Sequence, residues 1–272
     1  MNNSIDDKRK IFHDLHNDGC FILPNPWDVG SAKLLENLGF KALATTSSGY
    51  SWSCGKADGH LSRDETLAHL RQMVQSSNLP INADFESGFS DTTEGMIENI
   101  KMALNTGIAG ISIEDSTGNI DDPLRCISDA VERIQAARIA IDQSGENVML
   151  IGRAENFFVG VPNLEDTIIR LKAYSEAGAD CLYAPGIKTR EQIIAVVNAV
   201  LPKPVNVLIG WDSDLTVSEL EGLGVRRISL GGALARTALD GFIKTATTIA
   251  KKGTFHSYNN LYSNEYLNNQ FK

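Results

Sequence analysis

The chain is most constrained by a repeated alternation of short apolar segments with longer amphipathic ones. Short apolar runs bounded by turn residues are typical of buried strands, and apolar residues at a spacing of three and four are typical of helices. The expected strands are 21–24, 42–46, 80–85, 110–114, 148–153, 181–184, 205–209 and 227–230. The expected helices lie near 29–38, 63–77, 92–106, 128–143, 163–177, 189–199, 216–223 and 233–251. Strict alternation of this kind predicts an α/β protein with a parallel sheet.

Glycines close several of the helices just before the next strand, for example Gly107 and Gly178. A glycine after the last helical turn is a common helix end, because it adopts a left-handed backbone without steric cost. Eight such units in 272 residues predict a (β/α)₈ TIM barrel. A doubly wound open sheet is the alternative, and the eightfold count makes it the weaker one.

The sequence predicts one domain and a distinct C-terminal segment. No linker or low-complexity stretch divides residues 20–250, so we expect a single barrel domain over 1–252. Residues 253–272 mix aromatic residues with Asn and Ser. Because exposed aromatic residues are costly, we expect this segment to be an arm that packs on a neighbouring subunit or on the barrel. A frayed terminus is the simpler alternative.

Charge and cysteine content limit the partners and the compartment. The net charge of −9 disfavours nucleic acid, whose binding needs clustered Lys and Arg. No segment resembles a signal peptide or a membrane span, so we expect no membrane partner and a cytoplasmic location. The cysteines at 20, 54, 126 and 181 lack metal-ligand spacing and are expected to be reduced thiols.

Three acidic residues stand where predicted strands end: Asp84, Glu86 and Glu114. In an extended segment, residues two apart face the same way, so Asp84 and Glu86 are expected to point together. Active sites of barrels form at the carboxyl ends of the strands, and adjacent strands bring these three carboxylates within reach of one ion. Mg²⁺ prefers oxygen ligands and keeps several waters. The pattern therefore predicts a magnesium site.

Other strand ends carry polar residues as well. Arg153 ends the fifth expected strand and is placed to bind a substrate carboxylate with two parallel hydrogen bonds. Residues 45–48 follow the second strand. Asn206 lies in the seventh strand and is counted with the candidate substrate-binding residues.

Several motifs in this order resemble the isocitrate lyase/phosphoenolpyruvate mutase superfamily. They are the segment SAKLLENLGFKALATTSSGYS, the D-x-[DE]-x-G-[FY] stretch at 84–89, the strand GISIED and the arginine in IGRAENF. The resemblance covers about residues 20–250. It implies a (β/α)₈ barrel whose last helix is exchanged between subunits, a homodimer or homotetramer, and Mg²⁺, or Mn²⁺ in its place. It also implies a small 2-oxo-carboxylate or phosphonate substrate, in which a C–C or P–C bond is broken or formed through a metal-stabilised enolate.

The resemblance also implies a role for each matching residue. Asp84 matches the metal ligand, and Glu86 and Glu114 complete the shell through waters. Asp58, in GKADGH, matches an acidic residue that helps to hold the metal or acts on the substrate. The substrate-gripping stretch corresponds to Thr46, Ser47 and Ser48, and the arginine that binds the oxo-acid corresponds to Arg153.

One family motif is missing. The lyases carry K-[KR]-C-G-H shortly after the fourth strand, where the cysteine is a general acid or base. This chain has STGNIDDPLRCIS at 116–128, and Cys126 comes later than the motif position. We therefore expect Cys126 to have no catalytic role, and expect members that decarboxylate, or that handle phosphonates, to be the better models.

Two further hypotheses remain. The first is a metal-independent barrel enzyme that binds the phosphate of a metabolite at the Gly231-Gly232 turn. The second is a catalytically reduced protein that binds a 2-oxo-acid without turnover.

Overall fold

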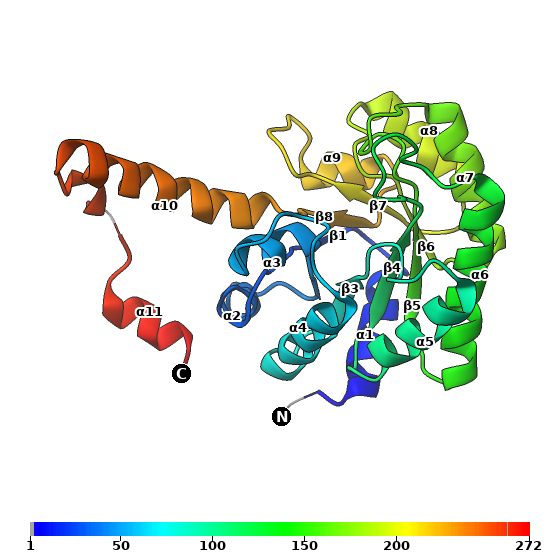
Figure 1. Cartoon of the computed structure of the whole chain (residues 1–272), viewed down its shortest axis with the longest axis horizontal. Coiled ribbons are helices and arrows are strands. Elements are labelled where there is room, and N and C mark those ends of the chain that lie inside the picture. Colours follow the sequence, from blue (N-terminus) through cyan, green and yellow to red (C-terminus); the bar gives the residue numbers. More distant parts are fainter. Residues whose placement is uncertain (1–2, 260) are drawn as a thin grey trace.

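Parallel strands form one sheet that closes on itself in the computed structural model, which describes residues 3–259 and 261–272. Figure 1 shows these strands at the centre of the molecule with helices around them. The strands are β1 (Phe21–Leu23), β2 (Leu43–Ala44), β3 (Ile81–Asp84), β4 (Gly110–Glu114), β5 (Met149–Arg153), β6 (Cys181–Tyr183), β7 (Val205–Leu208) and β8 (Arg227–Ser229). Each lies within its predicted range, and the (β/α)₈ barrel is confirmed.

The sheet runs in the order β1-β8-β7-β6-β5-β4-β3-β2, and contacts between its two end strands nearly close it into a barrel. β1 pairs with β8 in parallel, with Phe21 opposite Arg227. The remaining seam, between β1 and β2, is bridged where the Ala44 amide donates to the Pro24 carbonyl at 3.0 Å. The Asn25 side chain adds a second link, donating to the Thr45 carbonyl at 2.9 Å.

Eight helices follow the strands, as expected, and each predicted boundary is correct to within two residues. They are α2 (Val29–Asn37), α4 (Arg63–Ser76), α5 (Thr93–Leu104), α6 (Ile127–Ser144), α7 (Leu164–Glu176), α8 (Arg190–Val200), α9 (Val217–Gly222) and α10 (Ala233–Lys252). Capping explains several of these starts: Ser62 and Glu65 form a reciprocal capping box at α4, as Thr216 and Glu219 do at α9.

Among the residues that the structure describes, four helical segments were not predicted: α1 (Ile5–Leu15), α3 (Ser47–Ser53), the 3₁₀ helix η1 (His256–Tyr258) and α11 (Asn264–Gln270). α1 begins with a capping box between Ser4 and Asp7, a signal that was present in the sequence. Its Phe12 is fully buried among the side chains inside the barrel and lies close to Gly110, the first residue of β4. α1 therefore closes the end of the barrel where the strands begin.

Two apolar layers follow from the alternation of side chains along the strands. Residues such as Ile111 and Leu150 face outward and pack against the helices. Met149, Ile151 and Leu208 belong to the second cluster, which fills the barrel interior. Toward the carboxyl ends the inward residues become polar, and this change produces the site.

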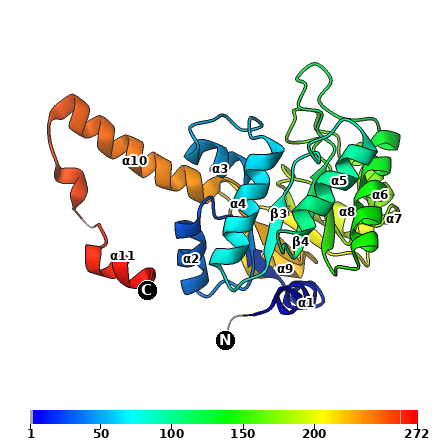
Figure 2. The same cartoon turned by 60° about the horizontal axis from the view of Figure 1, so that its bottom comes forward.

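α10 does not cover the barrel. Figures 1 and 2 show it extending away from the strands, and Phe242 and Ile243 are 70% and 58% exposed. The segment after it turns back toward α2, where Asn37 donates to the carbonyl of Gln270 at 2.7 Å. An exchanged last helix, and a separate role for residues 253–272, remain predictions. Along the described parts of the chain, no helix combines the length and apolar character needed to cross a membrane.

Candidate active site

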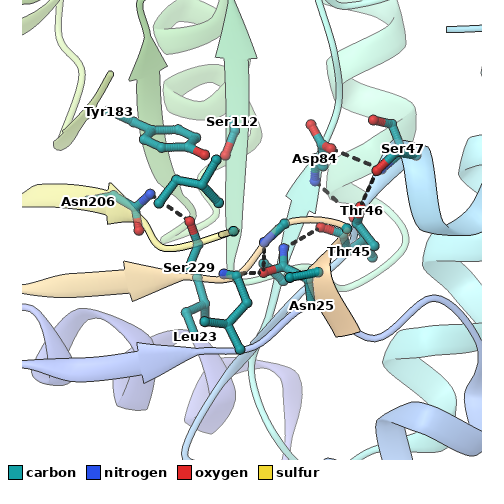
Figure 3. Close-up of a pocket in the computed structure, with 18 of the residues that line it drawn as sticks. Leu23, Asn25, Thr45, Thr46, Ser47, Asp84, Ser112, Tyr183, Asn206 and Ser229 are labelled. Carbon is teal, nitrogen blue, oxygen red and sulfur yellow. Dashed lines mark hydrogen bonds between the residues drawn. The ribbon is translucent and has the colours of Figure 1, made fainter. Parts of the chain in front are cut away.

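A cavity of about 390 Å³ opens at the carboxyl ends of the strands. Figure 3 shows polar side chains from several strands pointing into it. The predicted residues that line it are Thr46, Ser47, Ser48, Asp58, Asp84, Arg153 and Asn206. Two predicted metal ligands, Glu86 and Glu114, lie behind this lining.

Arg153 sits at the centre of the charged groups. Glu114 on β4 is directly opposite it on β5, so the two side chains leave the barrel wall together. The Arg153 Nη1 atom lies 3.1 Å from Glu114 Oε2 and 3.3 Å from Asp84 Oδ1, and its Nε donates to Glu155. Burial opposes the charge of Arg153, but Glu155 and Glu114 raise its pKa well above the ordinary value. The guanidinium is thus held charged and fixed, which suits recognition of a carboxylate.

Asp84 connects β3 with the start of α3. Its Oδ2 atom accepts the Ser47 amide at 3.0 Å, and its own amide donates to Thr45 Oγ1 at 2.9 Å. No helix was expected at 46–48, but Thr46 is the N-cap of α3 and accepts the Gly49 amide. The Ser47 amide consequently serves Asp84 in this structure, and a role for it in gripping a substrate remains a prediction.

Glu86 departs from the expected geometry. β3 ends at Asp84, and Glu86 has a left-handed backbone with φ of 48°, so the extended pattern that predicted its direction stops before it. Its side chain lines a small space of about 10 Å³, beside Asp84 and His69. Burial, together with the charges of Asp84 and Asp58, raises the pKa of Glu86 to about 7.

The remaining carboxylates are crowded as well. Burial raises the pKa of Asp58, and the nearby Asp84 raises it further. Burial also raises the pKa of Glu114 well above its ordinary value, against the opposing charge of Arg153. Carboxylates in this situation take up protons or bind a cation.

The donor set fits a hydrated divalent cation better than a closed cage. In residues 3–259 and 261–272, no three His, Cys, Asp or Glu side chains converge as a preformed metal site. The reason is visible in the ion pairs, because Arg153 lies between Asp84 and Glu114. Mg²⁺ is commonly held by one or two carboxylates and several waters. Asp84, Asp58 and Glu86 could together provide these carboxylates and hold the waters. The place of Glu114 in such a shell stays a prediction.

Several cavity residues were not predicted as site residues: Asn25, Asn82, Ser112, Tyr183, Arg227 and Ser229. Most of them are inward positions of strands, and the alternation of side chains could have identified them. Asn25 lies just after β1. Its Oδ1 atom accepts the amides of Leu230 and Gly231, each at 2.9 Å, while its Nδ2 reaches β2 (Figure 3). Asn25 therefore ties together the carboxyl ends of β8 and β2.

Cys126 is the N-cap residue of α6, where it is exposed and its Sγ lies 3.2 Å from Ser128 Oγ. It lies outside the cavity lining. This position is consistent with the expectation that it has no catalytic role.

The fold and the charged cavity place the chain among the barrel enzymes that carry their sites at the carboxyl ends of the strands. The family model for phosphoenolpyruvate phosphomutase matches residues 12–250. The chain belongs to this family, within the superfamily of phosphoenolpyruvate mutases and isocitrate lyases, whose members are C–C lyases and phosphomutases.

Individual relatives agree with this assignment. An uncharacterised protein of Mycobacterium tuberculosis (strain CDC 1551 / Oshkosh) is 34% identical over 81% of each chain. An oxaloacetate decarboxylase of Paraburkholderia xenovorans (strain LB400) is 27% identical over 71% of this chain and 66% of its own. A solved structure from Burkholderia cenocepacia J2315, provisionally described as a lyase/mutase, is 44% identical and superimposes with a TM-score of 0.95, covering 98% of this chain and 97% of the other.

Proposed function

We propose that the protein is a Mg²⁺-dependent enzyme that breaks or forms a C–C or P–C bond in a small 2-oxo-carboxylate by way of an enolate. The observation that carries the proposal is the crowding of Asp58, Asp84 and Glu86, whose charges oppose one another at the cavity beside a fixed arginine. A cation relieves this repulsion.

Asp84 is the residue we assign to direct contact with the metal, with Asp58 and Glu86 acting through waters. When bound, Mg²⁺, or Mn²⁺, would draw electrons from the 2-oxo group and lower the energy of an enolate. Holding the metal costs Asp84 little rearrangement, because the Ser47 amide already fixes its carboxylate.

Arg153 is the residue we assign to the substrate carboxylate. Its contacts with Glu114 and Glu155 restrict the guanidinium to one orientation, and the Tyr183 ring lies 5.2 Å from its Cζ atom. A preorganised charge of this kind stabilises negative charge that develops next to it. Asn206 and the hydroxyl groups of Thr46 and Ser48 provide polar contacts on other sides of the cavity.

Cleavage of a C–C bond is the reaction we favour. In a 2-oxo-diacid whose second carboxylate is attached to the carbon next to the oxo group, as in oxaloacetate, breaking the C–C bond to that carboxylate releases carbon dioxide and leaves the bonding electron pair in an enolate. A proton from solvent then converts the enolate into the 2-oxo-acid, so no cysteine acid is needed at the position of the missing motif. The similarity to an oxaloacetate decarboxylase supports this choice at 27% identity. The phosphonomutase-like reaction is the second candidate, since the matching family model is that of phosphoenolpyruvate phosphomutase.

The metal-independent alternative has less support. It requires the Gly231-Gly232 turn to offer its amides to a phosphate. The amides of Leu230 and Gly231 already donate to Asn25 Oδ1, each at 2.9 Å. Binding of a phosphate to the Gly231 amide would have to break its bond to Asn25.

A spectrophotometric screen tests the proposed function. The candidate substrates are oxaloacetate, phosphonopyruvate, 2-methylisocitrate, dimethylmalate and isocitrate, each with Mg²⁺ or Mn²⁺. We expect turnover of at least one of them, and its loss in EDTA. Turnover that is unchanged in EDTA would contradict the proposal, and binding without turnover would favour the catalytically reduced binding protein.

A further inference from the structure

Arg227 lies deep in the cavity, on the first position of β8. It faces the barrel interior on the same side of its strand as Ser229, two residues nearer the opening. The side chain is buried, with only 2% of its surface exposed. A guanidinium in this position belongs to the floor of the pocket.

The hydrogen bonds of Arg227 are incomplete. Its Nε donates to Asn206 Oδ1 at 2.9 Å. Its Nη1 atom is buried and has no hydrogen-bond acceptor among the residues that the structure describes. An unsatisfied donor on a buried charge costs several kcal/mol in general, so it calls for a partner.

Three other buried or half-buried arginines of this protein have carboxylate partners, whereas the buried Arg133 donates to the backbone carbonyls of Ser87 and Ser90. Arg9 pairs with Glu146, Arg153 with Asp84 and Glu114, and Arg170 with Asp115 and Asp166. For Arg227, as for Arg133, no ion pair is found within residues 3–259 and 261–272. Arg133 lies outside the cavity lining, so of these two arginines Arg227 is the one that lines the cavity without a counter-charge.

The ionisable neighbours of Arg227 do not supply that charge. They are His16, Cys181 and Tyr183. Burial lowers the pKa of His16 to about 3, and burial raises the pKa of the Cys181 thiol and that of Tyr183, the latter to about 12. All three are neutral near pH 7.

The walls around this floor are polar. Asn206 donates to Ser229 Oγ at 2.9 Å, and Asn82 donates to Ser112 Oγ at 3.0 Å. All four residues line the same cavity as Arg153 and Asp84. Figure 3 shows Asn206, Ser229, Ser112 and Tyr183 grouped in the same part of the pocket. Arg153 and Arg227 thus line one cavity together with these polar side chains.

We propose that Arg227 binds a second carboxylate of the substrate, so that the enzyme selects 2-oxo-diacids over 2-oxo-monoacids. The planar guanidinium can form two parallel hydrogen bonds with a carboxylate, and a substrate carboxylate there would supply the counter-charge that no protein side chain provides. This assignment rests on the proposed function for the 2-oxo end of the ligand, whereas the contact at Arg227 is independent of the metal.

Matched ligand pairs test the assignment by calorimetry. 2-Oxoglutarate differs from 2-oxovalerate, and oxaloacetate from 2-oxobutyrate, by a carboxylate in place of a terminal methyl group. In Mg²⁺ we expect the wild-type protein to bind the diacid of at least one pair at least ~10-fold more tightly. Arg227→Met should remove this preference and leave the monoacid affinity within about twofold, since only the second contact is lost. Equal affinities for both members of both pairs in the wild-type protein would overturn the proposal.

Controls separate a binding role from a structural one. Arg226→Met changes the adjacent arginine, which donates to the Gly19 carbonyl, and should keep the preference. Arg227→Lys keeps the positive charge and should keep part of the preference for the diacid. This variant also tests the assignment if Arg227→Met fails to fold. Equal weakening of diacid and monoacid in a folded Arg227→Met protein would overturn the assignment.

A last measurement distinguishes this proposal from the proposed function. If no 2-oxo-acid binds in Mg²⁺, the proposed function fails, and glutarate in EDTA then tests Arg227 alone. Glutarate should bind the wild-type protein and lose at least ~10-fold in affinity in Arg227→Met. Equal binding to both proteins, or to neither, would overturn the assignment of Arg227.

Discussion

At the scale of the residue, Asp84 joins more of the site than the other carboxylates do. It contacts Arg153 and Ser47, and its charge raises the pKa of both Asp58 and Glu86. Asp84→Asn keeps the size of the side chain and removes the charge. We expect Mg²⁺-linked ligand binding to disappear and kcat/KM to fall by ~10²-fold or more, because the principal metal ligand is weakened. The exposed Asp212→Asn serves as a control, and parent-level turnover in Asp84→Asn would exclude the assignment.

Glu86 predicts a pH dependence of stability. The pKa of Glu86 is about 7 in the folded protein, against an ordinary value of 4.5. Between these two pH values the folded state therefore binds a proton that the unfolded state has lost. Without metal, the free energy of unfolding should therefore fall as the pH rises from about 4.5 to about 7, by about 2 kcal/mol.

Denaturant unfolding in EDTA at pH 5 and pH 8 measures this difference. Glu86→Gln should reduce it, since the substituted side chain does not titrate. Mg²⁺ should raise the stability most at pH 8, where the carboxylate is ionised. An identical pH profile for Glu86→Gln and the parent protein would show that Glu86 is not the group responsible.

Substitution of Cys126 is predicted to change the activity little. Because it caps α6 outside the cavity, Cys126→Ser should keep kcat/KM within about twofold, the range usual for surface substitutions. Steady-state kinetics on a substrate found in the screen provide the test. A loss of activity would point instead to the lyase mechanism, with this thiol as the acid.

At the scale of the element, Asn25 links the ends of β8 and β2. It makes one hydrogen bond to the Thr45 carbonyl after β2 and accepts two from the amides that follow β8, and it is only 6% exposed. Asn25→Ala leaves a carbonyl and two amides without these partners, so we expect the free energy of unfolding to fall by about 2–4 kcal/mol. Chemical denaturation measures the loss, and Asn37→Ala, which removes a bond on the exposed surface, should cost under about 1 kcal/mol. Equal losses in the two variants would contradict the role of Asn25.

The elements also show what the sequence could reveal. The barrel strands and the helices after them were predictable because burial imposes regular apolar spacing on both. α3 was not, since SSGYSWS carries no apolar periodicity and starts from the Thr46 cap. The left-handed backbone of Glu86 was not predictable, because the extended pattern of β3 gives no signal of where it ends. The ion pairs of Arg153 depend on the register of β4 and β5, which local sequence does not encode.

At the scale of the whole molecule, α10 presents an apolar stripe without a partner in the described chain. Leu239, Phe242 and Ile243 follow helical spacing and are 38%, 70% and 58% exposed. A second copy of the chain would cover such a stripe, as the expected exchange of the last helix implies.

Light scattering tests this arrangement. The double variant Phe242→Lys and Ile243→Lys should shift the molar mass from that of an oligomer toward 29.6 kDa, because it places charges in the contact. Lys251→Glu changes a charge on another side of α10 and should leave the mass unchanged. A parent protein that is already monomeric would contradict the exchange.

The most direct measurement of the central proposal is calorimetry of oxalate binding with Mg²⁺ and with EDTA. If the carboxylates around Asp84 hold a cation that the ligand shares, the affinity should be at least ~100-fold higher with Mg²⁺. Equal affinity in EDTA would contradict a metal-dependent 2-oxo-acid enzyme.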